Sequence, residues 1–107
     1  VFSPDSSRIA AVAKEDKIWK IVVDGKVWKN NFDMAWKPVF SPDSKIVAAK
    51  VERKGKYTIA VNDRLWGHEC ESVWDPIFNS EGDKVLLRSI EDGKYYRRVL
   101  PTADLIS

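Results

Sequence analysis

The chain has 107 residues, of which 44% are hydrophobic and 32% are charged, and its formal net charge is +2. This is the composition of a globular domain, which excludes collagen-like and disordered chains. No apolar run reaches the roughly 20 residues of a transmembrane helix. The 18 basic and 16 acidic residues are interspersed, so we expect neither nucleic-acid binding nor direct insertion into a membrane.

A repeat of 38 residues is the strongest pattern in the chain. The hexapeptide Val-Phe-Ser-Pro-Asp-Ser at residues 1–6 recurs at residues 39–44, and Ile-Phe-Asn-Ser-Glu-Gly at residues 77–82 is a degraded third copy. The chain opens inside this motif and without an initiator Met, so we expect it to be a piece of a longer protein. We treat it as a single domain made of repeat one (1–38), repeat two (39–76) and a truncated repeat three (77–107).

The first half of each repeat is predicted to be a turn followed by a hairpin. Ser-Pro-Asp-Ser favours a turn because Pro fixes φ and the Asp and Ser side chains bond nearby backbone. An apolar strand follows, at residues 9–13 in repeat one. The next strand alternates and places Trp19, Ile21 and Val23 on one face.

The second half of each repeat is predicted to add two more strands. Asp-Gly at residues 24–25 is a hairpin signal, after which a further strand begins near Val27. Residues 36–40 are expected to form a strand at a sheet edge, because Pro38 cannot donate to a ladder. No segment keeps a 3.6-residue apolar period, so almost no helix is expected.

Four short strands in about 40 residues are typical of a β-propeller blade. The pairs Ala10-Ala11 and Ala48-Ala49 fit strands that are covered on both faces. A β-solenoid usually repeats at shorter intervals, and a single antiparallel sandwich requires no such self-similarity. We therefore expect an all-β fold of three four-stranded antiparallel propeller repeats.

The third repeat is expected to be incomplete, and Arg97 stands where Ile21 and Ile59 stand in the other two. Three blades do not close a ring, since typical propellers have about 4–8. We therefore expect a fragment of a larger propeller, or a chain that self-associates to close a ring. Because its end faces are uncovered, such a fragment should either self-associate or be poorly stable alone.

The motif Phe-Ser-Pro-Asp-Ser at residues 2–6 and 40–44 resembles the WD40-like PD40 repeat of TolB-type β-propellers, and residues 78–82 match it loosely. That family usually has Gly where this chain has Ser6 and Ser44. The resemblance implies a propeller fold and says little about function.

A second resemblance covers nearly the whole chain. The segments at residues 33–44, 55–61 and 91–98 are similar to the tryptophan-rich TmcD-type subunit of a transmembrane redox complex in sulfate-reducing bacteria. This implies an accessory subunit on the cytoplasmic side, held at the membrane by its partners, with a periplasmic location as the alternative. Partner subunits would carry the haems and iron–sulfur clusters.

No catalytic, cofactor-binding or metal-binding residue is predicted in this chain. His68-Glu69-Cys70-Glu71 is the one group of potential metal ligands, and it falls short of the roughly four ligands that structural zinc needs. The chain has one cysteine and lacks the motifs of iron–sulfur clusters and covalent haem. It also lacks the common nucleotide and nucleophile motifs, so we expect no cofactor and no enzyme activity.

The five tryptophans are the one oddity of composition. Repeating aromatic residues usually fill equivalent core positions, but Trp is also enriched where proteins bind one another. If any residues contact a partner, we expect them to be Trp28 and Trp66 with the basic residues Lys26 and Arg64. The sequence thus favours a non-catalytic interaction or scaffold module, an accessory subunit of a membrane-associated electron-transfer complex.

Two other functions are compatible with the same pattern. The chain is alternatively the propeller domain of a hydrolase or peptidase whose catalytic residues lie outside it. A small-ligand site in a central channel is the third interpretation, with Lys37 and Asp75 as the candidate polar groups near the inner strands.

Overall fold

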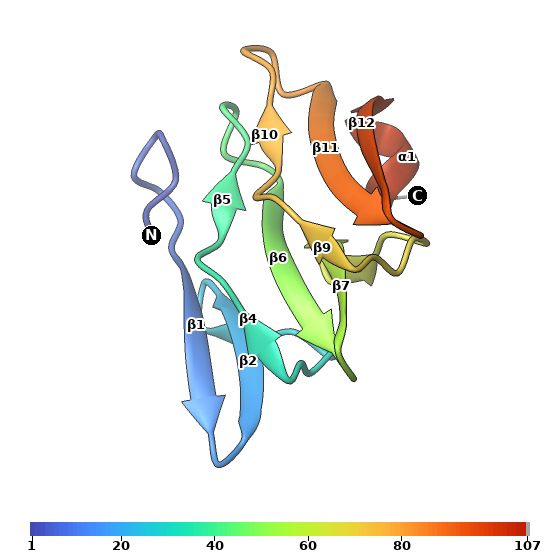
Figure 1. Ribbon diagram of the computed structural model, residues 1–107. Coiled ribbons are helices and arrows are strands. Elements are labelled where there is room, and N and C mark those ends of the chain that lie inside the picture. Colours follow the sequence, from blue (N-terminus) through green and yellow to red (C-terminus); the bar gives the residue numbers. More distant parts are fainter. Residues whose placement is uncertain (107) are drawn as a thin grey trace.

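The computed structural model describes residues 1–106 as short strands followed by one short helix (Figure 1). No helix among these residues is long and apolar enough to cross a membrane. The elements, in chain order, are β1 (Ala10–Glu15), β2 (Ile18–Val23), β3 (Lys26–Val27), β4 (Met34–Ala35), β5 (Val39–Phe40), β6 (Val47–Arg53), β7 (Lys56–Val61), β8 (Arg64–Leu65), β9 (Ser72–Val73), β10 (Ile77–Phe78), β11 (Lys84–Glu91), β12 (Lys94–Pro101) and α1 (Thr102–Ile106).

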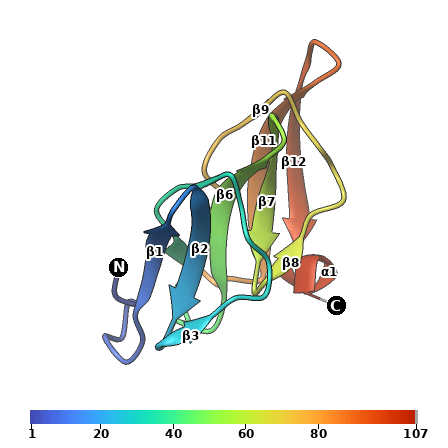
Figure 2. The same cartoon turned by 90° about the horizontal axis from the view of Figure 1, so that it is seen from below.

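The strands form three antiparallel sheets that lie side by side in chain order (Figures 1 and 2). Sheet 1 has the order β1-β2-β3, and in sheet 2 the strands β4 and β5 both pair with β6, which is followed by β7 and β8. In sheet 3, β9 and β10 both pair with β11, which is followed by β12. The prediction of an all-β, antiparallel fold is confirmed, while residues 1–106 form no closed ring.

Only sheet 2 has all four predicted strand positions. In sheet 1 the innermost position is represented by a single bridge between Phe2 and Ile9. Sheet 3 ends at β12, and the chain then turns into α1. Sheet 3 therefore lacks its outermost strand, as expected for repeat three, and sheet 1 lacks a full innermost strand.

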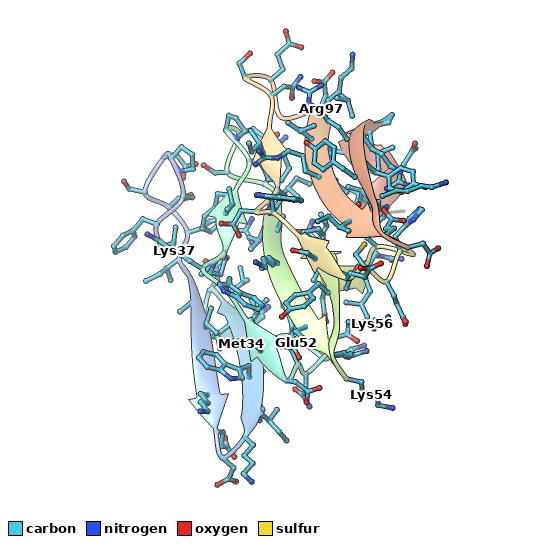
Figure 3. All side chains as sticks on the ribbon, viewed as in Figure 1. Met34, Lys37, Glu52, Lys54, Lys56 and Arg97 are labelled. Atoms are coloured by element: carbon cyan, nitrogen blue, oxygen red, sulfur yellow. The ribbon has the colours of Figure 1, made fainter. Side chains whose placement is uncertain are left out.

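The boundaries between the sheets do not coincide with the boundaries between the sequence repeats. Met34 and Ala35, at the end of repeat one, pair with Glu52 and Val51 of β6 and so belong to sheet 2; Figure 3 labels Met34 and Glu52 at this end of the sheet. In the same way β9, from repeat two, pairs with β11 of sheet 3. Each repeat thus supplies an edge strand to the next sheet, and backbone hydrogen bonds tie the repeats together.

Two hydrophobic clusters fill the spaces between the sheets. The first is composed of Ala10, Ile21, Val23, Phe32, Ala35, Phe40, Val47, Ala49, Val51 and Ala60. The second is composed of Ala48, Ile59, Val61, Cys70, Val73, Val85 and Leu87. Adjacent Ala48 and Ala49 are both fully buried, at 0% exposed, and they belong to different clusters. Small side chains at successive positions are therefore explained by a strand that is covered on both faces.

The turn before each long strand requires a left-handed residue. Its φ is positive at the same place in all three repeats: 61° at Ser6, 65° at Ser44 and 77° at Gly82. This region favours Gly, because a Cβ atom there approaches the backbone. The degraded third copy still forms the turn: Asn79 Oδ1 accepts a hydrogen bond from Lys84 N, as Ser41 Oγ does from Ile46 N.

The helix α1 is not foreseen by the sequence pattern, because five residues are too few to display a helical period. Its first residue, Thr102, is anchored to the third turn: its N donates to Asp83 O at 2.8 Å and its Oγ1 to Gly82 O at 2.9 Å. Leu105 and Ile106 then pack against the second hydrophobic cluster. The helix therefore lies against β8 of sheet 2 as well as β12 of sheet 3.

Candidate functional site

Trp28 and Trp66 occupy equivalent places, directly after β3 and β8. Their backbone N atoms donate to Ile21 O at 2.9 Å and Ile59 O at 2.8 Å. Each indole packs against one hydrophobic cluster and remains half-buried. Both tryptophans therefore help to close the core, and each also presents part of its ring at the surface.

The four residues predicted to contact a partner fall into two unlike pairs. Lys26 and Trp28 line an open groove between sheets 1 and 2. Arg64 and Trp66 are their counterparts one repeat later, but there α1 lies against β8 (Figure 2). Leu105 packs against the same hydrophobic cluster as Trp66. The structure thus leaves one of the two equivalent positions open.

The open groove, here called the cationic groove, has a volume of about 370 Å³ and is lined mainly by Arg8, Val23, Lys26, Trp28, Lys45 and Val47. Val23 and Val47 are buried and belong to the first hydrophobic cluster. Trp28 is half-buried, while Lys26 and Lys45 are exposed. The groove therefore combines apolar and aromatic walls with basic side chains that remain in water.

Three hydrogen-bond acceptors fix Arg8 in place at this groove. Its Nε donates to Asp24 Oδ2 at 2.9 Å, and its Nη1 donates to the carbonyl oxygens of Ser44 and Lys45, each at 2.9 Å. A hydrogen bond from Arg8 and another from the backbone of Ile9 hold the pKa of Asp24 below its usual value. Arg8 thereby connects the turn of repeat one to the turn of repeat two.

The lysines of the groove have no such partners. Among residues 1–106, neither Lys26 nor Lys45 lies within ion-pair distance of a carboxylate. The sequence argument identified Lys26 but missed Arg8 and Lys45, which follow the turns of two different repeats. Arg8 aligns with Ile46 and Lys45 with Ser7, so the repeat gave no signal that pairs them. The packing of sheet 1 on sheet 2 brings them to one groove.

A polar cluster lies between sheets 2 and 3, where the sequence had suggested potential metal ligands. Glu91 accepts hydrogen bonds from Arg98 and Ser89, and its Oε1 lies 3.0 Å from His68 Nδ1. Burial opposes ionisation of Glu91, but the hydrogen bonds from Arg98, Ser89 and His68 outweigh it and lower its pKa to about 2. Cys70 is buried, and burial raises the pKa of its thiol.

The ion pair between Glu91 and Arg98 lies within sheet 3, and His68, from the linker between β8 and β9, adds a contact to it. Ser89 donates to Glu91 and makes no hydrogen bond to His68, so a nucleophile–base pair is not assembled. In residues 1–106 no three potential ligands gather in a way that could hold a metal ion. Lys37 and Asp75, the candidates for a channel ligand, are exposed in the linkers β4–β5 and β9–β10.

Sheets 1 and 3 each have one face that no other sheet covers. On sheet 1 this outward face carries Ala11, Ala13, Glu15, Ile18, Lys20 and Val22, as the pairing of β1 with β2 requires. On sheet 3 it carries Leu86, Arg88, Tyr95, Arg97 and Val99. Ile18 is 45% exposed, Tyr95 57% and Val99 56%. Large apolar side chains at the two ends of the stack are therefore left in contact with water.

The two outward faces are the two halves of an interface that is built twice inside the molecule. Ala11 on sheet 1 aligns with Ala49, which sheet 2 turns toward sheet 1. Arg97 on sheet 3 aligns with Ile59, which sheet 2 turns toward sheet 3. One end of the stack thus presents the face that receives a preceding sheet, and the other presents the face that receives a following sheet.

Comparison with known proteins gave no matching family model and no matching curated protein.

Proposed function

We propose that the chain is a non-catalytic scaffold module of the β-propeller type, which binds protein partners through the outward faces of sheets 1 and 3. The observation that carries this proposal is the repeat equivalence of those faces with the covered faces inside the molecule. An interface between unlike faces is head-to-tail, and it continues to add units until a ring closes. Uncovered apolar sheet faces of this kind favour protein contacts over exposure to water.

The two faces are complementary in size. Ala11 and Ala13 on sheet 1 leave space for long side chains, and Tyr95 and Arg97 project from the outward face of sheet 3. Arg97 is paired in register with Arg88, whose guanidinium group lies over the ring of Trp74. On sheet 1, Glu15 is exposed and lies 3.7 Å from Lys20 on the same face, so this face presents a carboxylate and an ammonium group side by side.

The partner for these faces is a sheet of the same repeat type, and a second copy of the chain is the simplest source of one. Two copies joined head-to-tail at both ends would bring six sheets together, which lies within the usual range of about 4–8 blades. The resemblance to the TmcD-type subunit extends the proposal to an accessory role in a membrane-associated electron-transfer complex. In that role the module would supply docking surfaces, and its partners would supply the cofactors.

Light scattering across a range of concentrations tests this proposal. The purified chain should pass from monomer to dimer as concentration rises, and Val99→Lys on the outward face of sheet 3 should hold it as a monomer. Met34→Lys is the matched control, because Met34 is 38% exposed but lies on sheet 2 (Figure 3). A wild-type chain that stays monomeric and well folded at every concentration would overturn the proposal.

A further inference from the structure

The cationic groove has a counterpart between sheets 2 and 3, and the two differ in what they contain. Shifting the lining residues Val23, Trp28 and Val47 by one repeat gives Val61, Trp66 and Val85. All three of the latter belong to or pack against the second hydrophobic cluster, together with Leu105 and Ile106 of α1. The position that is open between sheets 1 and 2 is therefore filled by a helical turn between sheets 2 and 3.

The backbone carbonyl groups that anchor this helical turn have counterparts at the cationic groove. Thr102 holds α1 by donating to the carbonyl oxygens of Asp83 and Gly82. At the cationic groove the matching carbonyl oxygens, those of Lys45 and Ser44, accept hydrogen bonds from Arg8 instead. Arg8 belongs to sheet 1 and adds no segment that covers the groove, so the apolar surface of Trp28 remains accessible.

The charges of the groove define what fits there. Arg8, Lys26 and Lys45 contribute three cations, and Asp24 is the one carboxylate among the lining residues. Asp24 is already engaged by Arg8 at 2.9 Å. A segment that places carboxylates beside Lys26 and Lys45 would therefore gain charge-assisted contacts without meeting a free negative charge.

We infer that the cationic groove binds a short acidic peptide segment of a partner protein, about one helical turn long, with an aliphatic side chain against Trp28 and carboxylates beside Lys26 and Lys45. The model for this ligand is α1 itself, in which Asp104 directly precedes the aliphatic pair Leu105 and Ile106. This inference rests on the proposed interaction role, and it adds a second surface together with the chemistry of the segment that binds there.

Fluorescence anisotropy with two labelled peptides tests the inference. The probe is Glu-Thr-Ala-Asp-Leu-Ile-Glu-Glu, and its control has Lys in place of each acidic residue. The intact chain should bind the acidic probe and not the control, and binding should weaken as salt screens the charges. The double variant Lys26→Glu/Lys45→Glu should weaken binding by about a hundredfold, about tenfold for each reversed charge.

A matched variant separates a local effect from a change in net charge. Lys17→Glu/Lys54→Glu makes the same charge change in the hairpin turns β1–β2 and β6–β7, and neither residue lines the groove. It should bind the probe as the wild type does. Failure of the wild type to bind the probe, or equal loss in the two double variants, would overturn the inference. Light scattering of Lys26→Glu/Lys45→Glu should give the wild-type mass, so this outcome is independent of the sheet faces.

Discussion

The interface between sheets 1 and 2 and the interface between sheets 2 and 3 occupy equivalent places but are closed by different chemistry. In the first, Arg53 at the end of β6 donates to the side chain of Asn30 at 3.0 Å and lies over the ring of Phe32. In the second, the matching positions hold Glu91 and His68, whose side chains lie 3.0 Å apart. The repeat determines which two positions are in contact. The type of interaction differs between the interfaces because the residues at both positions differ.

Glu91 is mostly buried and Arg53 is exposed, so we expect the two interfaces to differ most in the stability lost when a charged side chain is removed. Arg98→Ala should lower the free energy of unfolding by about 3 kcal/mol, because it leaves the mostly buried Glu91 without its cation. Arg53→Ala should cost about 0.5–1 kcal/mol, since Arg53 is exposed. Urea unfolding followed by tryptophan fluorescence measures both. Equal costs would mean that the two contacts are equally solvated, contrary to this account.

Acid should weaken the second interface more than the first. Glu91 has its pKa lowered from 4.5 to about 2, so its contribution is fully present above about pH 4.5 and is lost as pH falls toward 2. Because solvent reaches part of the cluster, we expect about 1–2 kcal/mol.

The measurement for this pH effect is the unfolding free energy of wild type and Glu91→Gln between neutral pH and pH 2. Asp5, Asp24 and Asp43 also have lowered pKa values, through hydrogen bonds from the serine side chains Ser7 and Ser41 and from Arg8. Both proteins contain these groups, so the difference between them isolates Glu91. That difference should shrink as pH falls; a constant gap would rule out titration of Glu91 as its source.

The smallest expected difference in stability comes from substitutions in the equivalent turns before β6 and β11. Gly82→Ser should cost about 1 kcal/mol, because φ is 77° there, although the added Cβ atom has room at 3.5 Å from Pro42 Cδ. Ser44→Gly relieves the same backbone strain but removes the hydrogen bond from Asp5 N to Ser44 Oγ at 3.3 Å. We expect a net gain of about 0.5 kcal/mol in thermal unfolding. A loss instead would show that the link between turns outweighs the strain.

The sequence was sufficient for those features that depend on local periodicity and turn chemistry. Alternation placed Ile21 and Val23 on the face of β2 that is buried, and Asp24-Gly25 does form a hairpin turn, with φ of 52° and 79°. These features follow from neighbouring residues alone. The pair Ala48-Ala49 does lie on a strand that is covered on both faces, but the expectation is not met for Ala10-Ala11, because Ala10 is buried while Ala11 is exposed on the outward face of sheet 1.

Contacts between repeats were beyond such reasoning. His68 and Glu91 are 23 residues apart, and Arg8 reaches carbonyl oxygens 36 and 37 residues away. The way one sheet packs on the next decides which of these side chains meet, and periodicity within a strand carries no information about it. The fold of α1 back over the second cluster was missed for the same reason. Trp28 and Trp66, the candidates for partner contact, also pack against the two hydrophobic clusters.

A mixing experiment tests the central claim most directly, namely that the outward faces of sheets 1 and 3 are complementary. Ala13→Arg blocks the face of sheet 1 and Val99→Lys blocks the face of sheet 3, so each variant alone should remain monomeric in sedimentation velocity. Mixed in equal amounts, they should form a one-to-one dimer, because each keeps the face that the other has lost. A mixture that sediments as monomers, or either variant forming dimers alone, would contradict the head-to-tail account.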